Sequence, residues 1–151
     1  RAWFEGWIAS GGIFELHGAT DLANDWSGLP MPGGFSMAWD PTDDVTLRDT
    51  AHPIATTPYA ISGVELDGWG NSAHGYLTDL VSVSSEIVVH EPARKPAIAE
   101  QLMEDGCILA TTQPLEMAWD QGDSRILENM ILDRECQPIR TYLPVVLRNY
   151  P

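Results

Sequence analysis

The apolar segments of this chain are short, and residues that favour turns interrupt them repeatedly. Several of these segments alternate apolar and polar residues with period two, which predicts strands with one buried face. Gly, Pro, Asn and Asp fill the intervals, as expected for tight connections. We therefore expect strands to be the dominant secondary structure. We expect them at residues 2–8, 13–17, 35–39, 45–48, 59–66, 76–83, 86–90, 107–112, 115–119, 126–132 and 139–147.

This number of short strands favours a mainly β fold, an antiparallel β-sandwich or a barrel-like domain. A chain of 151 residues is long enough to bury a core and fits one domain that spans residues 1–151. Residues 125–132 also fit a short helix, so that segment has two interpretations.

One helix is expected near residues 96–105. Pro96 suits the first turn of a helix, where its missing N–H costs nothing. Ile98 and Leu102 are i, i+4 neighbours and would lie on one helical face. Gly106 then follows as a left-handed stop, which completes the pattern of a short helix inserted among strands.

The tetrapeptide Met-Ala-Trp-Asp occurs twice, at residues 37–40 and 117–120. The likeness extends to the pattern M-A-W-D-x-x-D-x-x-x-L over residues 37–47 and 117–127. The two copies lie 80 residues apart, about half the chain, which is the spacing that an internal duplication would leave. We expect each copy to be a strand end that runs into an Asp-rich turn.

The chain is strongly acidic, with 22 acidic residues, eight basic residues and a formal net charge of −14. A nucleic-acid-binding protein needs clustered Lys and Arg to neutralise phosphates, and seven scattered arginines with one lysine do not supply them. An anionic membrane surface repels the chain for the same reason. No apolar run approaches the length of a membrane span, so neither nucleic acid nor membrane insertion is expected.

The Asp-rich turns are candidate calcium ligands. Asp40 and Asp43 in the first copy, and Asp120 and Asp123 in the second, place carboxylates three residues apart across a tight turn. Calcium is bound by six to eight hard oxygen atoms, which carboxylates and turn carbonyls supply. Asp is also an ordinary turn residue, because its side chain mimics the backbone. Calcium is the only cofactor that these patterns suggest.

Two cysteines, Cys107 and Cys136, lie in separate segments and form no CxxC pair. We expect them to form one disulfide, and two buried free thiols are the alternative. The four histidines show no metal-binding spacing, and a G-x-S-x-G elbow is absent. The sequence therefore designates no catalytic residue, and the balance is against an enzyme.

Six tryptophans are many for this length. Trp39 and Trp119 follow apolar partners at period two, which favours burial. Trp7, Trp26 and Trp69 lie near Gly-rich turns and are better candidates for exposure. Exposed in a row, these three would stack on sugar rings, as in carbohydrate-binding modules. Buried, they would fill the space between two sheets.

The chain ends in Thr-Tyr-Leu-Pro-Val-Val-Leu-Arg-Asn-Tyr-Pro. This tail resembles the Y-L-P-L-V-x-R-N endings of many secreted and cell-surface bacterial proteins, with matches at Tyr142, Leu143, Pro144, Arg148 and Asn149 and also at Val146. The resemblance implies export and an extracellular or cell-surface location. The chain begins without an initiator Met or an apolar targeting stretch, so we expect that a signal peptide has been removed.

These observations favour a secreted structural or cell-surface protein that assembles with copies of itself or with other surface proteins. Residues 2–8 and 141–147 are apolar and β-prone, and either segment could add as a strand to the sheet edge of a neighbour, giving a filament. Pairing of both termini within their own domain is the alternative. A carbohydrate-binding module and a small secreted hydrolase are the competing functions.

Overall fold

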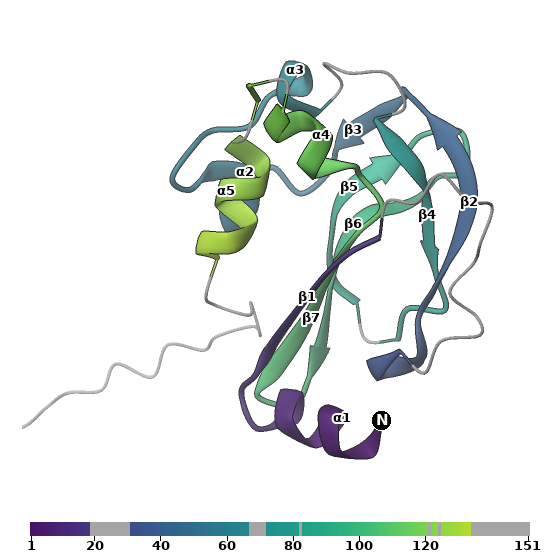
Figure 1. Ribbon diagram of the computed structural model, residues 1–151, viewed down its shortest axis with the longest axis vertical. Coiled ribbons are helices and arrows are strands. Elements are labelled where there is room, and N and C mark those ends of the chain that lie inside the picture. Colours follow the sequence, from purple (N-terminus) through teal and green to yellow (C-terminus); the bar gives the residue numbers. More distant parts are fainter. Residues whose placement is uncertain (19–30, 67–71, 82, 121, 124, 134–151) are drawn as a thin grey trace, which may run out of the picture.

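The computed structural model describes residues 1–18, 31–66, 72–81, 83–120, 122–123 and 125–133 (Figure 1). Strand residues outnumber helical ones, so the expectation of a mainly β fold is confirmed. The strands are β1 (Ile13–His17), β2 (Ser36–Thr42), β3 (Val45–Leu47), β4 (Ala73–Thr78), β5 (Val83–His90), β6 (Lys95–Met103) and β7 (Gly106–Thr111). The helices are α1 (Ala2–Ala9), α2 (Pro53–Thr56), α3 (Gly63–Leu66), α4 (Leu115–Asp120) and α5 (Arg125–Leu132), with a short 3-10 turn η1 at Pro32–Gly34.

Five strands form a mixed sheet in the order β1-β7-β6-β5-β3, and β2 pairs with β4 in a second, two-stranded sheet. Within the larger sheet, the pairs β3–β5, β5–β6 and β6–β7 are antiparallel, whereas β1 runs parallel to β7. The expected antiparallel sandwich is therefore corrected in one respect: the larger sheet is mixed. The described strands close no barrel.

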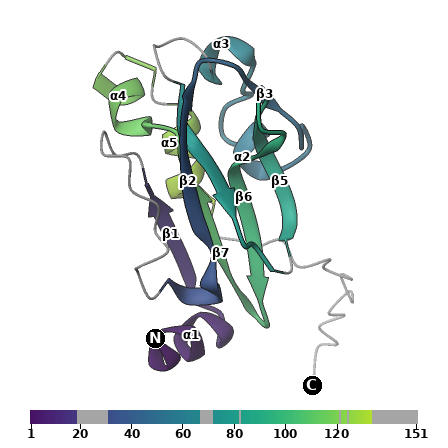
Figure 2. The same cartoon turned by 90° about the vertical axis from the view of Figure 1, so that its right-hand side faces the viewer.

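The two faces of the larger sheet carry different layers (Figures 1 and 2). Ile108 and Ala110 of β7 share one buried cluster with Met37 of β2 and Leu77 of β4. Leu109, between them, belongs to a second cluster that includes residues of α4 and α5. Because neighbouring side chains of a strand point to opposite faces, the β2–β4 sheet covers one face and the helices cover the other.

The helix expected at residues 96–105 is wrong, because this segment is β6. β6 lies between β5 and β7 and is buried on both faces. A strand buried on both faces has a continuous apolar run, so Ile98 and Leu102 imitate a helical i, i+4 pair. Gly106 begins β7 instead of ending a helix. A Cβ atom there would lie 1.9 Å from the Ile8 carbonyl oxygen, so the position requires glycine for close backbone approach.

The strand expected at residues 2–8 is also wrong, because this segment forms α1. The helix ends where Gly11 adopts a φ of +104°, and the Gly11 and Gly12 N–H groups donate back to carbonyls of α1. The Gly-Gly pair therefore closes a helix. Residues 115–119, expected as a strand, form α4. Part of the strand expected at residues 59–66 is also helical, because residues 63–66 form α3. Residues 125–132 form α5, which agrees with the helical interpretation of that segment and not with the expected strand.

The two Met-Ala-Trp-Asp copies adopt different secondary structures. Residues 37–40 lie in β2 and residues 117–120 in α4, so the described fold does not repeat between them. The neighbouring prolines explain the difference. Pro41 directly follows the first copy and would interrupt a helix. Pro114 precedes the second copy, where its carbonyl accepts from two helical N–H groups, and Gly122, at a φ of +85°, follows the helix.

Candidate functional site

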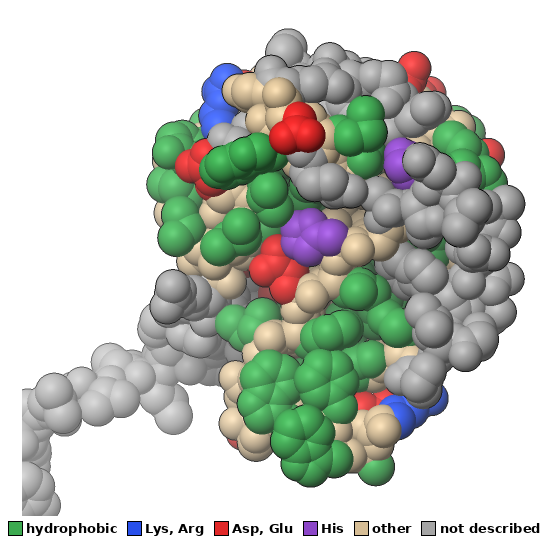
Figure 3. Space-filling model, in the orientation of Figure 1, with side chains coloured by type: hydrophobic (Ala, Val, Ile, Leu, Met, Phe, Trp, Pro, Cys, Tyr) green, Lys and Arg blue, Asp and Glu red, His purple; other side chains and the backbone are tan. Residues whose placement is uncertain are grey.

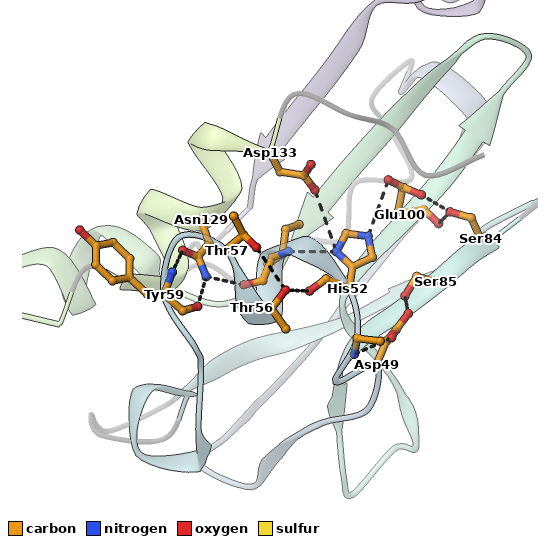
Figure 4. Close-up of polar contacts among 12 residues, drawn as sticks. Asp49, His52, Thr56, Thr57, Tyr59, Ser84, Ser85, Glu100, Asn129 and Asp133 are labelled. Carbon is orange, nitrogen blue, oxygen red and sulfur yellow. Dashed lines mark hydrogen bonds and ion pairs between the residues drawn. The ribbon is translucent and has the colours of Figure 1, made fainter. Parts of the chain in front are cut away.

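A buried polar cluster surrounds His52 (Figure 4). His52 precedes α2, whose first residue is Pro53, and its Nδ1 atom accepts a hydrogen bond from the Ile54 N–H at 3.2 Å. The imidazole thus caps the helix in the way that an Asn or Ser side chain usually does. Since Nδ1 is the acceptor, the neutral ring carries its proton on Nε2.

Two carboxylates face the ring from different elements. Glu100 of β6 places Oε2 3.8 Å from Nε2, and Asp133, at the end of α5, places Oδ2 4.0 Å from Nδ1. The side chains of His52 and Glu100 are 2% exposed and that of Asp133 is 6% exposed. Ser84 donates a hydrogen bond to Glu100. The cluster therefore brings buried polar side chains of α2, α5 and the central sheet together, although the His52 Nε2 atom makes no hydrogen bond among the described residues.

Asp49 forms the outer part of this cluster. Its carboxylate accepts hydrogen bonds from the Ser85 hydroxyl at 2.6 Å and from the Ala51 N–H at 3.2 Å. The Ser85 hydrogen bond is the main cause that lowers the pKa of Asp49, and partial burial opposes it. A shallow surface groove lies beside the carboxylate. Its lining residues are Arg48, Asp49, Val83, Ser84, Ser85 and Glu86.

The hydrogen bonds of the cluster differ from those of a serine hydrolase. Such an enzyme needs a hydroxyl that is hydrogen-bonded to the imidazole which removes its proton. Here Ser84 donates to Glu100, and Ser85 donates to Asp49. Among the described residues, neither ring nitrogen of His52 accepts from a hydroxyl. This geometry favours a structural role for the cluster.

Asn129 of α5 strengthens the same junction. Its side chain is buried, donates to the carbonyls of Ile54 and Tyr59 at 2.7 Å each, and accepts from the Tyr59 N–H at 3.1 Å. One amide thus satisfies three backbone groups of the segment that includes α2, and α5 is fixed over it.

The second candidate site is the outer edge of β1. The Gly12 carbonyl accepts from β7 at 3.2 Å, and the Gly18 N–H donates to β7 at 2.9 Å. Backbone groups alternate between the two sides of a strand, so even-numbered residues bond to β7. The odd-numbered residues therefore direct N–H and C=O away from the sheet. They are Ile13, Glu15 and His17, and no strand of the described chain pairs with them.

Apolar side chains lie beside this edge on the helical face of the sheet. Glu15 and His17 are in contact with each other at 2.6 Å and line a groove of ≈ 420 Å³ with Leu127 and Ile131 of α5. Ile131 is 55% exposed and Leu132 is 52% exposed. Exposed aliphatic side chains next to an open strand edge are typical of a contact surface.

Aromatic side chains are exposed at α1. Trp3 is 79% exposed and Trp7 is 43% exposed. The Phe4 ring is nearly parallel to both, at an interplanar angle of 11° to Trp3 and 4° to Trp7. Figure 3 shows the resulting apolar area at the α1 end of the molecule and further apolar side chains over α5.

The acidic residues that the sequence suggested for calcium lie at the ends of two different elements, β2 and α4. Asp40 is in β2, where its carboxylate is 3.6 Å from His90, and Asp43 accepts from the Ser72 N–H at 3.4 Å. Asp120 ends α4, and Asp123 follows it. The described residues include no group of three His, Cys, Asp or Glu side chains arranged to hold a metal ion. Calcium binding stays a prediction.

The described residues test only some of the expectations for the tryptophans and cysteines. Trp7 is exposed as expected, whereas Trp26 and Trp69 lie outside the described residues. The expected burial of Trp119 is wrong, because it is 54% exposed on α4. Cys107 is buried in β7 and is not a free thiol. Cys136 lies outside the described residues, so the pairing of these two cysteines stays a prediction.

No protein-family model, curated protein or solved structure matches this chain. Within the described part, no helix is long and apolar enough to cross a membrane. Sequence reasoning missed both candidate sites. The His52-Pro53 pair and the acidic Glu100 inside an apolar segment were available signals for the buried cluster. The open edge of β1 depends on the strand order, which no local pattern reveals.

Proposed function

We propose that this chain is a secreted structural or cell-surface protein that assembles with copies of itself through the open edge of β1. The parallel pairing of β1 at the end of the sheet carries this proposal. A strand at the end of a sheet has a row of N–H and C=O groups with no neighbouring strand, and β1 holds this position among the described strands. An open parallel edge flanked by exposed Ile131 and Leu132 is suited to pairing with another strand.

Of the two terminal segments considered for strand donation, only the C-terminal one remains a candidate. Residues 2–8 form α1 and do not act as a donated strand in this fold. Residues 141–147 lie outside the described residues, so strand donation by this segment remains a proposal. Export rests on the resemblance of the tail, and the net charge of −14 would keep such a protein soluble between assembly events.

The test is the mass of the particle in solution. Sedimentation velocity over a range of protein concentrations, with calcium and with a chelator, should show a mass that rises with concentration. Ile131→Glu should weaken association about tenfold or more, because a charge would be buried at the contact. Val81→Glu is the matched control, since Val81 is 63% exposed and follows β4, away from the β1 edge. A native protein that stays monomeric at every concentration would contradict self-assembly.

Carbohydrate binding is the second candidate function, and the aromatic group on α1 favours it. Three nearly parallel rings, two of them exposed, offer apolar surfaces on which sugar rings stack. Titration calorimetry with soluble polysaccharides tests this function. Binding that Trp3→Ala abolishes while the mass is unchanged would assign the aromatic group to a ligand. Equal affinity in native protein and variant would exclude that assignment.

A further inference from the structure

We propose that two copies of this chain pair their β1 strands edge to edge in antiparallel orientation, about a two-fold axis at Leu16. The inference rests on the proposed self-assembly and names its contact. It identifies the partner as a second copy of the same strand, joining two five-stranded sheets into one. The experiments below distinguish this pairing from pairing of the same edge with another segment, such as residues 141–147.

The backbone restricts the possible registers. Only Ile13, Glu15 and His17 direct their N–H and C=O groups to the open edge, because the Gly12 and Gly18 backbone groups are bonded to β7. In an antiparallel ladder, hydrogen-bonded residues face each other in pairs. Odd-numbered residues must therefore oppose odd-numbered residues, and the two-fold axis must pass at one of the five residues of β1, 13 to 17.

Charge selects among these registers. An axis at residue 15 would set Glu15 against Glu15 of the partner subunit, and like charges directly opposite destabilise a sheet. An axis at residue 13 or at residue 17 pairs only that one outward-facing residue within β1 and leaves the other two without an opposite β1 residue. An axis at residue 14 places Glu15 opposite an apolar side chain. An axis at Leu16 places Glu15 opposite His17 of the partner subunit, and the symmetry repeats this favourable pair.

The side chains already present at the edge fit this register. The Glu15 carboxylate and the His17 imidazole are in contact at 2.6 Å within one strand, and their side chains are 25% and 29% exposed. The Glu15 and His17 side chains are therefore partly accessible and can contact the corresponding side chains of a second copy while they still line the groove. Their chemistry is also self-complementary, which an interface between identical copies requires.

The flanking layers agree with a two-fold axis perpendicular to the sheet. This operation keeps the helical face of one copy next to the helical face of the other. Leu127 and Ile131, which line the groove beside Glu15 and His17, would then approach the same side chains of the partner subunit. Aliphatic surface that is exposed in one copy would be removed from water in the pair (Figure 3).

Two charge variants test the pairing. Glu15→Lys/His17→Lys makes both positions positive, and His17→Glu makes both negative. Each variant alone should self-associate at least about tenfold more weakly than the native protein, because like charges then face each other twice. An equimolar mixture should form a one-to-one pair with a dissociation constant within about threefold of the native value. Mass measurement detects both results, and circular dichroism confirms that each variant is folded.

The outcomes separate this inference from self-assembly in general. A native protein that never assembles contradicts both. Assembly of each variant at native strength contradicts the β1 pairing and leaves self-assembly intact. Loss of assembly on deletion of residues 141–151, with both charge variants unaffected, would assign the edge to the tail. Oxidative cross-linking checks the register: Leu16→Cys should link two copies and Phe14→Cys should not, and the reverse would overturn the axis at Leu16.

Discussion

At the scale of single residues, the fold depends on a histidine that acts as a helix cap and as a partner for buried carboxylates. His52 Nδ1 accepts from the first turn of α2, while Glu100 and Asp133 lie within 4.0 Å of its ring. Buried carboxylates are costly without hydrogen bonds or opposite charge nearby. Their closeness to the ring makes His52 the residue that most directly links α2 to the sheet.

Replacing His52 by Ala should lower the free energy of unfolding by about 2–3 kcal/mol, through loss of the cap and of a polar neighbour for buried carboxylates. Urea denaturation measures this change. His52→Asn is the matched control, since Asn also accepts a hydrogen bond from a helix N-terminus and should lose less than half as much. Equal losses in both variants would show that the cap contributes nothing.

The stability that Asp49 contributes should depend on pH. The Ser85 hydrogen bond lowers the pKa of Asp49 in the folded state below its ordinary value of 3.8. The folded protein therefore releases this proton more readily than the unfolded chain, so the contribution is present above pH 3.8 and is lost as pH falls through the folded-state pKa. Solvent screening keeps it below about 1 kcal/mol.

Urea denaturation of the native protein and of Asp49→Asn between pH 6 and pH 3 tests this dependence. The difference in free energy of unfolding between the native protein and Asp49→Asn should be constant near pH 6 and should become smaller toward pH 3. A difference that widens as the pH falls would mean that the sign of the shift is wrong.

At the scale of elements, close backbone contact joins α1 to the sheet. Gly106 opens β7 directly beneath the end of α1, and a Cβ atom there would lie 1.9 Å from the Ile8 carbonyl oxygen and 2.4 Å from that of Gly12. Both neighbours are backbone atoms, so no side chain can move aside. The position of α1 against β7 therefore requires glycine at residue 106, which has no Cβ atom.

Gly106→Ala should lower the free energy of unfolding by about 2–3 kcal/mol, because the helix and the strand must separate. Gly6→Ala is the control, since Gly6 lies on α1 outside this contact and nothing lies within 4 Å of a Cβ atom there. This control should raise stability by about 0.5–1 kcal/mol. Thermal or urea denaturation of both variants gives the comparison, and a neutral Gly106→Ala would exclude the close contact.

The positions of two neighbouring strands could be predicted from the sequence. β1 was placed at its bounds by period-two alternation after the Gly11-Gly12 pair, and β7 was placed within one residue of its bounds as a short apolar run after Gly106, although it is buried throughout. β6 was mistaken for a helix because it is buried on both faces and shows no alternation, while Pro96 and Gly106 at its two ends imitate helix boundaries. α1 was mistaken for a strand because its aromatic residues are exposed, and a helix without an apolar stripe gives no clear periodicity.

At the scale of the whole molecule, function depends on what the topology brings together. The His52 cluster gathers residues 49, 52, 85, 100 and 133, and no spacing in the sequence relates them. The open edge of β1 is likewise a property of strand order. In the described part of the chain, β1 is the last strand of the mixed sheet, so its outward-facing backbone groups and the exposed side chains of α5 beside them form the surface on which the proposed pairing rests.

Amide hydrogen exchange of β1, resolved by residue, tests the central claim most directly. The amides of Phe14 and Leu16 should exchange slowly at every protein concentration, because they belong to the ladder with β7. The amides of Glu15 and His17 should exchange rapidly in dilute protein and become protected as the concentration rises into the range of assembly. Rapid exchange of these two amides in assembled protein would contradict pairing at the β1 edge, as would protection that is already complete in the monomer.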